Sequence, residues 1–423
     1  MVAALIGGGV VVALALGLGL GLGLRRHGAG ASGRDRNTSD VLLHPAPGSL
    51  WVGASPDWSR YSVKHFDSAV QNHAIIYDAF FHLSDALYTP GCRFNTLTNY
   101  QTDEPGDCFD FIAEQVKATG AIMSISLMPD VVGFGLAEII APDSSIPARF
   151  AAKLKSLADA DPRLRMMVRF GHEMNGNWYT YAGHPAEYVQ AFRVMATAVR
   201  RSVPDRVAFI WSPNANMDYP WGYTGVDSQN LEPGSRNTSD PRFELLDTNG
   251  DGVFDHHDDF ASPYYPGDEY ADWVGLSVYY YNFTDKTQNA QVTPGFVYQA
   301  ITVGSQTDAA LYPNAPNFIQ QYSVAKNKPF MISETSAPSL NTSTSAITAL
   351  DAKSGMWEQV WNASLTKEFP TYHGGIWFDY AKEEGEGKEM ALRDFRVTDD
   401  PEVRSNFAAY LKKLGERVTW ARG

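Results

Sequence analysis

The chain has 423 residues, a formal net charge of −14, 44% apolar residues and 19% charged residues. This composition allows a large buried core and excludes a chain that is disordered throughout. No run of Lys or Arg occurs beyond residue 48, which excludes a nucleic-acid-binding protein and favours a neutral partner over an acidic one.

The N-terminal segment differs from the rest of the chain. Residues 2–24 carry no charge, and as a helix they would span about 35 Å, enough for the core of a bilayer. A cleaved signal peptide has a positive start and a shorter apolar run, so residues 1–24 are expected to be a transmembrane signal anchor. Arg25 and Arg26 lie on the wrong side for export of the C-terminal part. A basic cytoplasmic segment ahead of Met1 would resolve this conflict.

Residues 25–48 are polar and aperiodic, and they predict a linker to one catalytic domain at 49–423. Export of that domain, either tethered or secreted, is also indicated by sequons for N-glycosylation. These sequons lie at Asn37, Asn237, Asn282, Asn341 and Asn362. In an exported protein Cys92 and Cys108 are expected to form a disulfide that stabilises the fold by roughly 3 kcal/mol. The alternative is two unrelated buried thiols.

Short apolar runs alternate with helical patterns from residue 50 onward, which indicates repeated βα units. Helical spacing of apolar residues predicts helices beginning at Phe109, at Pro185 and near Val403. Eight buried strands with helices between them predict a (β/α)8 TIM barrel with loop insertions. The alternative is an open doubly wound sheet, although no Gly-rich phosphate loop follows the first strand. The eight runs are Leu50–Ala54, Ala74–Phe81, Ala121–Leu127, Met166–Phe170, Val207–Trp211, Trp273–Val278, Phe330–Ile332 and Gly375–Phe378.

Two glutamates follow predicted strands at their C-terminal ends, where barrel enzymes carry their chemistry. Glu173 lies in the segment RFGHEMNGNWY after the fourth strand, and Glu334 directly follows the seventh run in MISE. Burying a carboxylate without compensation is costly, so neither glutamate suits a core position. Two facing carboxylates can divide the work of glycosidic cleavage, since one attacks the anomeric carbon and the other protonates the leaving oxygen. The alternative is a pair of salt bridges at the barrel rim.

The segment 169–179 resembles the acid/base motif of glycoside hydrolase family 26, the endo-β-1,4-mannanase family of clan A retaining glycosidases. The resemblance extends in strand order over most of the chain from about residue 50, and it makes Glu173 the acid/base and Glu334 the nucleophile. The supporting and substrate-binding residues that it implies are Arg169, His172, Asn175, Trp178, Trp211, Tyr279 and Trp377.

The resemblance also implies a role for several of these residues. His172 would orient the acid/base, Tyr279 would hydrogen-bond the nucleophile, Trp178 would contact a sugar and Trp377 would lie under the reacting sugar. Ordinary barrel packing is the alternative for the three tryptophans. Arg169 would either hold a catalytic carboxylate or make only structural contacts inside the barrel. In both cases a buried arginine needs a partner for its charge.

Departures from the family pattern leave the substrate open. Residues 127–129 are Leu-Met-Pro where mannanases of the family often carry Trp-His, and Phe378 follows Trp377 where they often place an Arg. We therefore expect a retaining hydrolase of β-linked polysaccharide, with β-1,4-mannan first and a β-glucan or β-1,3-xylan as alternatives. A membrane-tethered carbohydrate-binding protein with little activity is the rival from another class.

No cofactor is expected for catalysis. A metal-assisted hydrolase would need several His and carboxylate side chains at strand ends, and His172 is the one such His that the pattern places there. Nothing in the sequence predicts an oligomeric state.

Residues 247–258 match the EF-hand loop pattern D-x-N-x-D-G, with Gly252 at the sixth position. Asp at position twelve shortens the reach of the last ligand, and no clear helices flank the loop. A structural Ca²⁺ is expected here, and an unliganded Asp/Gly turn is the alternative. The expected ligands are Asp247, Asn249, Asp251, the Val253 carbonyl and Asp258.

Overall fold

The computed structural model describes residues 43–88, 109–215, 219–223, 231–236, 239–303, 317–385 and 390–422. The expected membrane anchor at 1–24, two of the sequon asparagines and both cysteines lie outside these ranges. Within them, no helix is long and apolar enough to cross a bilayer. Of the remaining sequons, Asn341 and Asn362 are exposed. Export, the anchor and the disulfide stay predictions.

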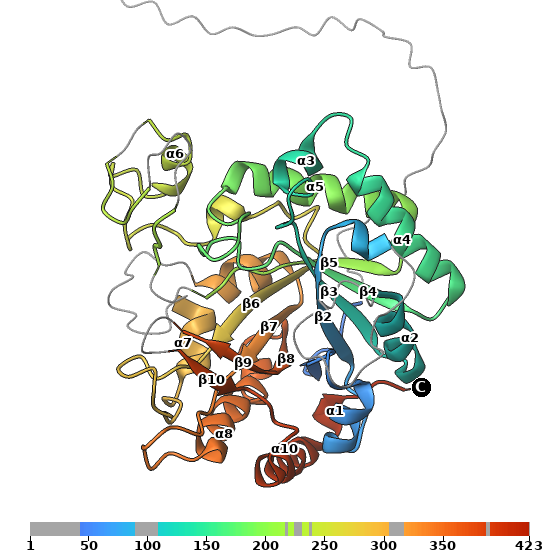
Figure 1. Cartoon of the computed structure of the whole chain (residues 1–423), viewed down its shortest axis with the longest axis vertical. Coiled ribbons are helices and arrows are strands. Elements are labelled where there is room, and N and C mark those ends of the chain that lie inside the picture. Colours follow the sequence, from blue (N-terminus) through green and yellow to red (C-terminus); the bar gives the residue numbers. More distant parts are fainter. Residues whose placement is uncertain are drawn as a thin grey trace, which may run out of the picture. The chain divides into compact units, whose positions relative to one another are not determined.

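Eight parallel strands close into a barrel, as predicted (Figure 1). Their order around the barrel follows the sequence, and the first strand pairs with both the second and the eighth. Each strand overlaps one predicted run, because a strand buried on both faces is a nearly continuous apolar segment. The strands are β1 (Leu50–Pro56), β2 (Ile76–His82), β3 (Ile122–Met128), β4 (Arg165–Phe170), β5 (Val207–Trp211), β6 (Trp273–Tyr279), β7 (Phe330–Ser336) and β8 (Tyr372–Asp379).

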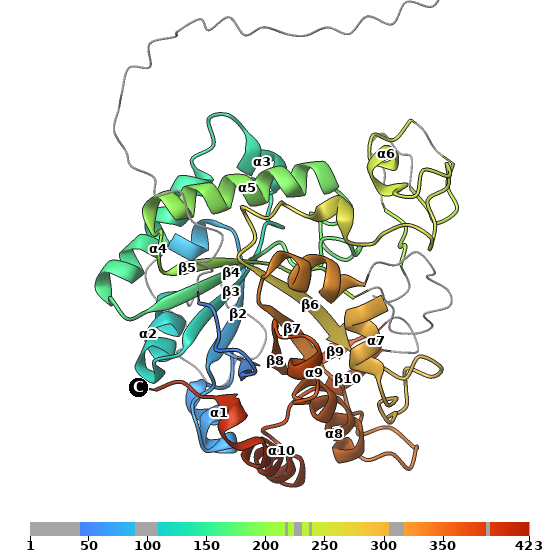
Figure 2. The ribbon, with the colours of Figure 1, turned by 180° about the vertical axis from the view of Figure 1, so that it is seen from behind.

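Helices follow the strands and surround the barrel (Figures 1 and 2). The three predicted helices are confirmed. The second of them begins with Pro185, and the N–H that proline lacks would have no partner in the first turn of a helix. The third begins after Asp400, whose carboxylate accepts hydrogen bonds from two backbone amides. The α-helices are α1 (Val63–Val70), α2 (Phe109–Thr119), α3 (Leu136–Ile140), α4 (Ile146–Ala160), α5 (Pro185–Ser202), α6 (Phe243–Leu246), α7 (Phe296–Val303), α8 (Ala349–Val360), α9 (Leu365–Glu368) and α10 (Pro401–Leu414).

Two β elements were not predicted. A short strand, β11 (Val418–Thr419), pairs with β1. An antiparallel hairpin of β9 (Ala381–Glu384) and β10 (Ala391–Asp394) follows β8 and lies beside β6–β8 in both views (Figures 1 and 2). The β9 sequence AKEE lacks the period-two alternation that indicates a strand. This hairpin matters for the site, because it stands next to the C-terminal end of the barrel.

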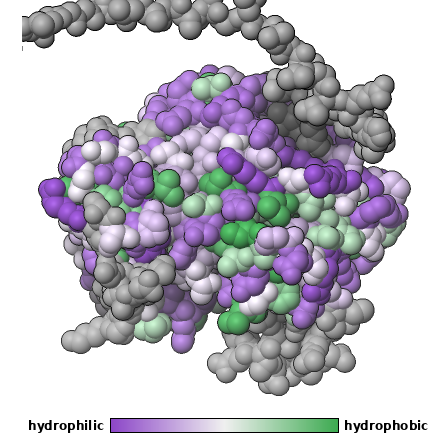
Figure 3. Space-filling model, turned by 90° about the horizontal axis from the view of Figure 1, so that it is seen from above, coloured by the Kyte–Doolittle hydropathy of each residue, from purple (hydrophilic) through white to green (hydrophobic). Residues whose placement is uncertain are grey.

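Hydrophobic side chains reach the surface at scattered points. Figure 3 shows one face of the molecule, on which hydrophilic residues surround a smaller hydrophobic group near the centre. Trp178 is 44% exposed and follows the fourth strand, so an aromatic ring is available to solvent at that strand end. The exposed large hydrophobic residues among those described are Phe111, Val132, Trp178, Leu245, Tyr298, Met390 and Leu392.

Barrel closure depends on close backbone contact between β1 and β8. Gly374 pairs with Trp51 and has a φ of +84°, and a Cβ placed there would lie 2.6 Å from the Trp51 carbonyl oxygen. Gly234 has the same φ of +84° but has no atom within 4 Å of its would-be Cβ. Comparing alanine substitutions at the two glycines therefore distinguishes the cost of backbone strain from the cost of a steric clash.

We predict that Gly374→Ala lowers the free energy of unfolding by clearly more than Gly234→Ala. Both variants incur about 1–2 kcal/mol for left-handed backbone. Gly374→Ala adds about 1–3 kcal/mol of overpacking at the β1–β8 seam. Chemical denaturation of the two variants measures the difference, and equal losses would show that β1 and β8 can separate at no cost.

Candidate active site

Glu173 and Glu334 line one cleft of about 570 Å³ at the C-terminal ends of β4 and β7. Glu173 lies three residues after β4, and its backbone is left-handed, with a φ of 55°. Its amide donates to the Ser212 carbonyl oxygen at 2.9 Å, which ties the turn to the end of β5. Left-handed backbone at a residue other than glycine costs about 1 kcal/mol or more and gathers at functional sites.

Two donors hold the carboxylate of Glu334. Arg169 Nη1 donates to Oε2 at 2.5 Å, and the Tyr279 hydroxyl donates to Oε1 at 2.6 Å. Arg169 is fully buried, and its remaining nitrogens donate to Ser277 Oγ at 2.6 Å and to Ser212 Oγ at 3.0 Å. A buried guanidinium and a phenol on the two oxygens make charge-assisted hydrogen bonds and fix the direction of the carboxylate. The structure thus places Arg169 and Tyr279 on the carboxylate of Glu334, and their roles in catalysis stay predictions.

Neutral donors hold the other carboxyl group. Trp178 Nε1 donates to Glu173 Oε2 at 2.8 Å, and Asn214 Nδ2 donates to Oε1 at 3.1 Å. Burial, followed by the charge of Glu334, raises the pKa of Glu173, and Arg169 opposes this rise. Glu173 therefore keeps its proton to a higher pH than an ordinary glutamate, as a general acid requires.

His172 and Asn175 contact residues that line the cleft together with Glu173. His172 Nε2 lies 2.9 Å from the Tyr179 hydroxyl, and burial together with the charge of Arg169 lowers the pKa of His172 well below its ordinary value. The imidazole is therefore neutral. Asn175 donates to the Asn214 carbonyl oxygen at 2.9 Å and accepts from the Asn214 amide at 2.8 Å. It thereby positions the amide side chain that holds Glu173.

Two of the expected supporting and substrate-binding tryptophans do not reach the cleft. Trp211 and Trp377 are both fully buried, and neither lines the cleft. Trp211 packs against Tyr322, and Trp377 packs against Phe407 of α10 and donates its indole N–H to the Phe395 carbonyl oxygen at 2.9 Å. Alternate residues of a strand face opposite sides, and these strands turn their tryptophans toward the outer layer. Ordinary packing, the alternative considered for them, is what the structure has.

Asp78 on β2 was missed. It is 1% exposed and accepts hydrogen bonds from Ser124 Oγ at 2.6 Å and Ser126 Oγ at 3.0 Å. Ser126 Oγ in turn accepts from Arg169 Nη1 at 3.4 Å, which links Asp78 to the partner of Glu334. Burial raises the pKa of Asp78 to about 6. The available signal was a charged residue within an apolar run, opposite serines at alternate positions of the next strand.

The walls of the cleft come mostly from loops. Trp221 packs edge to face against Trp178 at 5.0 Å between ring centroids. The segment after β6 and the β9–β10 hairpin supply a further part of the lining, and no motif in these segments predicted that role. Their lining residues are Tyr281, Phe283, Lys286, Lys382, Glu384 and Arg393.

The expected calcium loop keeps part of the hydrogen bonding of an EF-hand loop. Asp247 Oδ2 accepts from the Gly252 amide at 2.9 Å, and Asn249 Oδ1 accepts from the Asp251 amide at 2.8 Å. Asp247 Oδ1 is buried and has no hydrogen-bond partner among the described residues. An unpaired buried oxygen at the first position fits a cation ligand.

Asp258 fits the expected site less well. Its Oδ1 accepts from the Thr248 amide at 2.7 Å, and its Oδ2 accepts from the Asp255 amide at 2.9 Å. Both oxygens of the twelfth position are thus engaged by the backbone. Binding a cation would need Asp258 to exchange at least one of these bonds.

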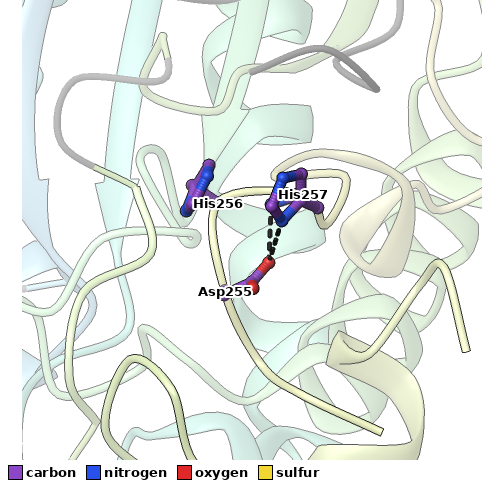
Figure 4. A group of neighbouring side chains, drawn as sticks. All are labelled: Asp255, His256 and His257. Atoms are coloured by element: carbon purple, nitrogen blue, oxygen red, sulfur yellow. Dashed lines mark hydrogen bonds and ion pairs between the residues drawn. The ribbon is translucent and has the colours of Figure 1, made fainter. Parts of the chain in front are cut away.

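A neighbouring group in the described chain brings three metal-type side chains within 4.8 Å of one another (Figure 4). It consists of Asp255, His256 and His257, and it contains none of the expected calcium ligands. Asp255 Oδ1 accepts from the His257 amide at 2.8 Å and lies 2.9 Å from His257 Nδ1. Local turn geometry explains this group, and the calcium site stays a prediction.

We predict that Ca²⁺ raises the melting temperature of the protein and that Asp247→Ala removes this rise. A ligand that binds the folded state alone stabilises it, and Asp247 supplies the unpaired oxygen. Melting curves in calcium and in chelator measure the effect, with Asp159→Ala as a surface control. Identical wild-type curves in the two buffers would count against the metal.

Asp78→Asn tests the buried carboxyl group. Since burial raises the pKa of Asp78 from 3.8 to about 6, its contribution to stability is present below pH 3.8 and is lost as the pH rises through about 6. Asparagine is neutral at every pH. The free energy of unfolding of the variant, relative to that of the wild type, should therefore rise by up to about 3 kcal/mol between these pH values. Denaturation at a series of pH values measures this, and a constant difference would contradict it.

No protein-family model and no curated protein sequence matches this chain. A β-mannanase of glycoside hydrolase family 26 from Bacteroides ovatus is 13% identical, with a TM-score of 0.50 over 88% of this chain and 91% of that chain. A mannanase from Bacillus subtilis is 15% identical, with a TM-score of 0.44 over 90% and 88% of the two chains. A β-glucosidase from Exiguobacterium marinum is 11% identical, with a TM-score of 0.46 over 88% and 99%. The likeness to the Bacteroides structure is one of fold.

Proposed function

We propose that this protein is a retaining glycoside hydrolase that cleaves a β-linked polysaccharide by double displacement. The observation that carries the proposal is the contrast between two glutamates in one cleft. A buried arginine and a tyrosine hold Glu334, whereas neutral donors and burial keep the proton on Glu173. Glycosidic cleavage by two carboxyl groups needs one that donates a proton and one that acts as a carboxylate, and the motif at residues 169–179 favours retention as the outcome.

In the first step Glu334 attacks the anomeric carbon as the bond from that carbon to the leaving oxygen breaks. Glu173 gives its proton to the leaving oxygen, which departs as a sugar hydroxyl. The products are a glycosyl ester on Glu334 and a Glu173 carboxylate. The N–H groups of Trp178 and Asn214 then stabilise the new negative charge on Glu173.

In the second step a water molecule attacks the anomeric carbon and gives a proton to Glu173. The ester bond breaks and Glu334 leaves as a carboxylate, which Arg169 and Tyr279 stabilise. Two inversions at one carbon give net retention. Both glutamates return to their starting protonation states, so no cofactor is needed.

The motif at residues 169–179 favours β-1,4-mannan as the substrate. Trp178 and Trp221, whose rings meet at the cleft, offer apolar faces of the kind on which sugar rings pack. A β-glucan or a β-1,3-xylan is the alternative within the same mechanism. A carbohydrate-binding protein would need neither the raised pKa of Glu173 nor the ion pair at Glu334, so we rank it lower.

Product analysis of the wild type and two variants on mannan, glucomannan, lichenan, laminarin, β-1,3-xylan and xylan tests the proposal. We expect oligosaccharides from mannan, no turnover by Glu334→Ala, and loss of about 10²–10⁴-fold in rate by Glu173→Ala. Glu173→Ala should spare aryl glycosides with good leaving groups, because these need no proton. Since the pKa of Glu173 is raised, wild-type activity should persist above the ordinary glutamate range and fall as this group ionises.

The substrate and the mechanism fail separately in this experiment. Release from a glucan or xylan instead of mannan would keep the mechanism and change the substrate. Near-normal hydrolysis of the polysaccharide by either variant would contradict the assigned roles of the two glutamates. A folded wild type that cleaves none of these polymers would favour the carbohydrate-binding protein or a glycan outside this set.

A further inference from the structure

Positive charges gather on one wall of the cleft. Lys286, Lys382 and Arg393 line it, and Glu384 is the one carboxylate that lines it beside them. Three positive charges against one negative charge leave this group of four at +2. With Glu334 counted and Glu173 protonated, the lining of the whole cleft still carries +1, in a chain whose net charge is −14. Composition favoured a neutral partner, but charges more than about 8–10 Å apart are largely screened in salt. The local group therefore decides what the cleft attracts.

Glu384 cannot neutralise the whole wall. It lies 2.9 Å from Lys382 Nζ and 3.4 Å from Arg393 Nε, and the Tyr281 hydroxyl also hydrogen-bonds to it. One carboxylate is thus shared by two cations and a phenol. Lys286 is exposed and makes no ion pair with any described residue.

The buried cation on this wall is held in place. Arg393 is 3% exposed, and its Nη1 donates to the Lys286 carbonyl oxygen at 2.8 Å, which joins the hairpin to the segment after β6. Its guanidinium carbon lies 5.5 Å from the centre of the Tyr281 ring. An arginine fixed in this way loses little conformational freedom when it binds an anion.

The wall also adjoins the catalytic centre. Lys382 Nζ lies 5.1 Å from the centre of the Phe378 ring, and that ring packs against Tyr279 at 6.0 Å between centroids. Tyr279 donates to Glu334. An anionic group bound at the wall would therefore sit on the same glycan whose bond is cleaved.

We propose that the preferred glycan carries an anionic substituent, a carboxylate or a sulfate ester, which Lys286, Lys382 and Arg393 bind. The proposal rests on the proposed function for the nature of the ligand, and it narrows the substrate class to acidic β-glycans. The rival explanation is that these cations only brace the hairpin against the segment after β6. In that case they would add nothing to the binding of a charged sugar.

Binding to the full chain carrying Glu334→Gln separates these explanations without relying on turnover. The probes are β-1,4-mannotetraose and cellotetraose. Each is used unmodified, with one C6 carboxylate, and with one C6 sulfate, and the charged group is placed on each sugar in turn. Calorimetry should give a Kd at least about tenfold lower for the best charged probe than for its neutral parent, shrinking as salt rises. A preference confined to carboxylates would indicate a uronic acid, and a preference that includes sulfates would indicate a sulfated glycan.

The double change Lys286→Ala and Lys382→Ala, added to this chain, should reduce the affinity for each charged probe to that for its neutral parent. Lys412→Ala with Lys413→Ala is the matched control, because both lysines are exposed on α10 and neither lines the cleft. The inference would be overturned if the charged probes bind no tighter than the neutral ones. It would also be overturned if the double lysine variant still prefers the charged probes. If the preference depends on these lysines but the protein cleaves no glycan, the inference of an anionic ligand would hold and the proposed hydrolase activity would be wrong.

Discussion

The buried ion pair between Arg169 and Glu334 organises the centre of this barrel. Arg169 projects from β4 into an interior that excludes water, and an unpaired guanidinium there would be severely destabilising. Its donors instead reach Glu334 on β7 and serines on or beside three other strands. One cation therefore links the strands that carry the catalytic residues, and it fixes the position of the Glu334 carboxylate.

The unequal surroundings of the two glutamates follow from that arrangement. Glu334 has the buried cation, so the charge of Glu334 then acts on Glu173, which has only neutral donors. Burial and a like charge both disfavour a second carboxylate in the same cleft. The left-handed backbone of Glu173 is stabilised by two hydrogen bonds. Its amide donates to the backbone at the end of β5, and its side chain accepts from Trp178.

Sequence patterns predicted the strands and the two glutamates because these depend on local signals. Runs such as Val207–Trp211 must be strands wherever they pack, and a glutamate at a strand end needs a special reason to be there. The same patterns could not tell which way Trp211 and Trp377 face, since a strand buried on both sides shows no alternation. The role of Asp78 and the cationic wall were missed because they depend on contacts between segments far apart in the chain, such as Arg393 with the segment after β6.

In the proposed double displacement Glu334 becomes covalently bound to the sugar, so that hydrolysis proceeds with retention. The most direct measurement is the anomeric configuration of the first product, followed by proton NMR during cleavage of whichever β-glycan the protein hydrolyses. Double displacement predicts that the β-anomer appears first and that the α-anomer forms later by mutarotation. Initial release of the α-anomer would mean a single displacement by water, and the assignment of Glu334 as nucleophile would then be wrong.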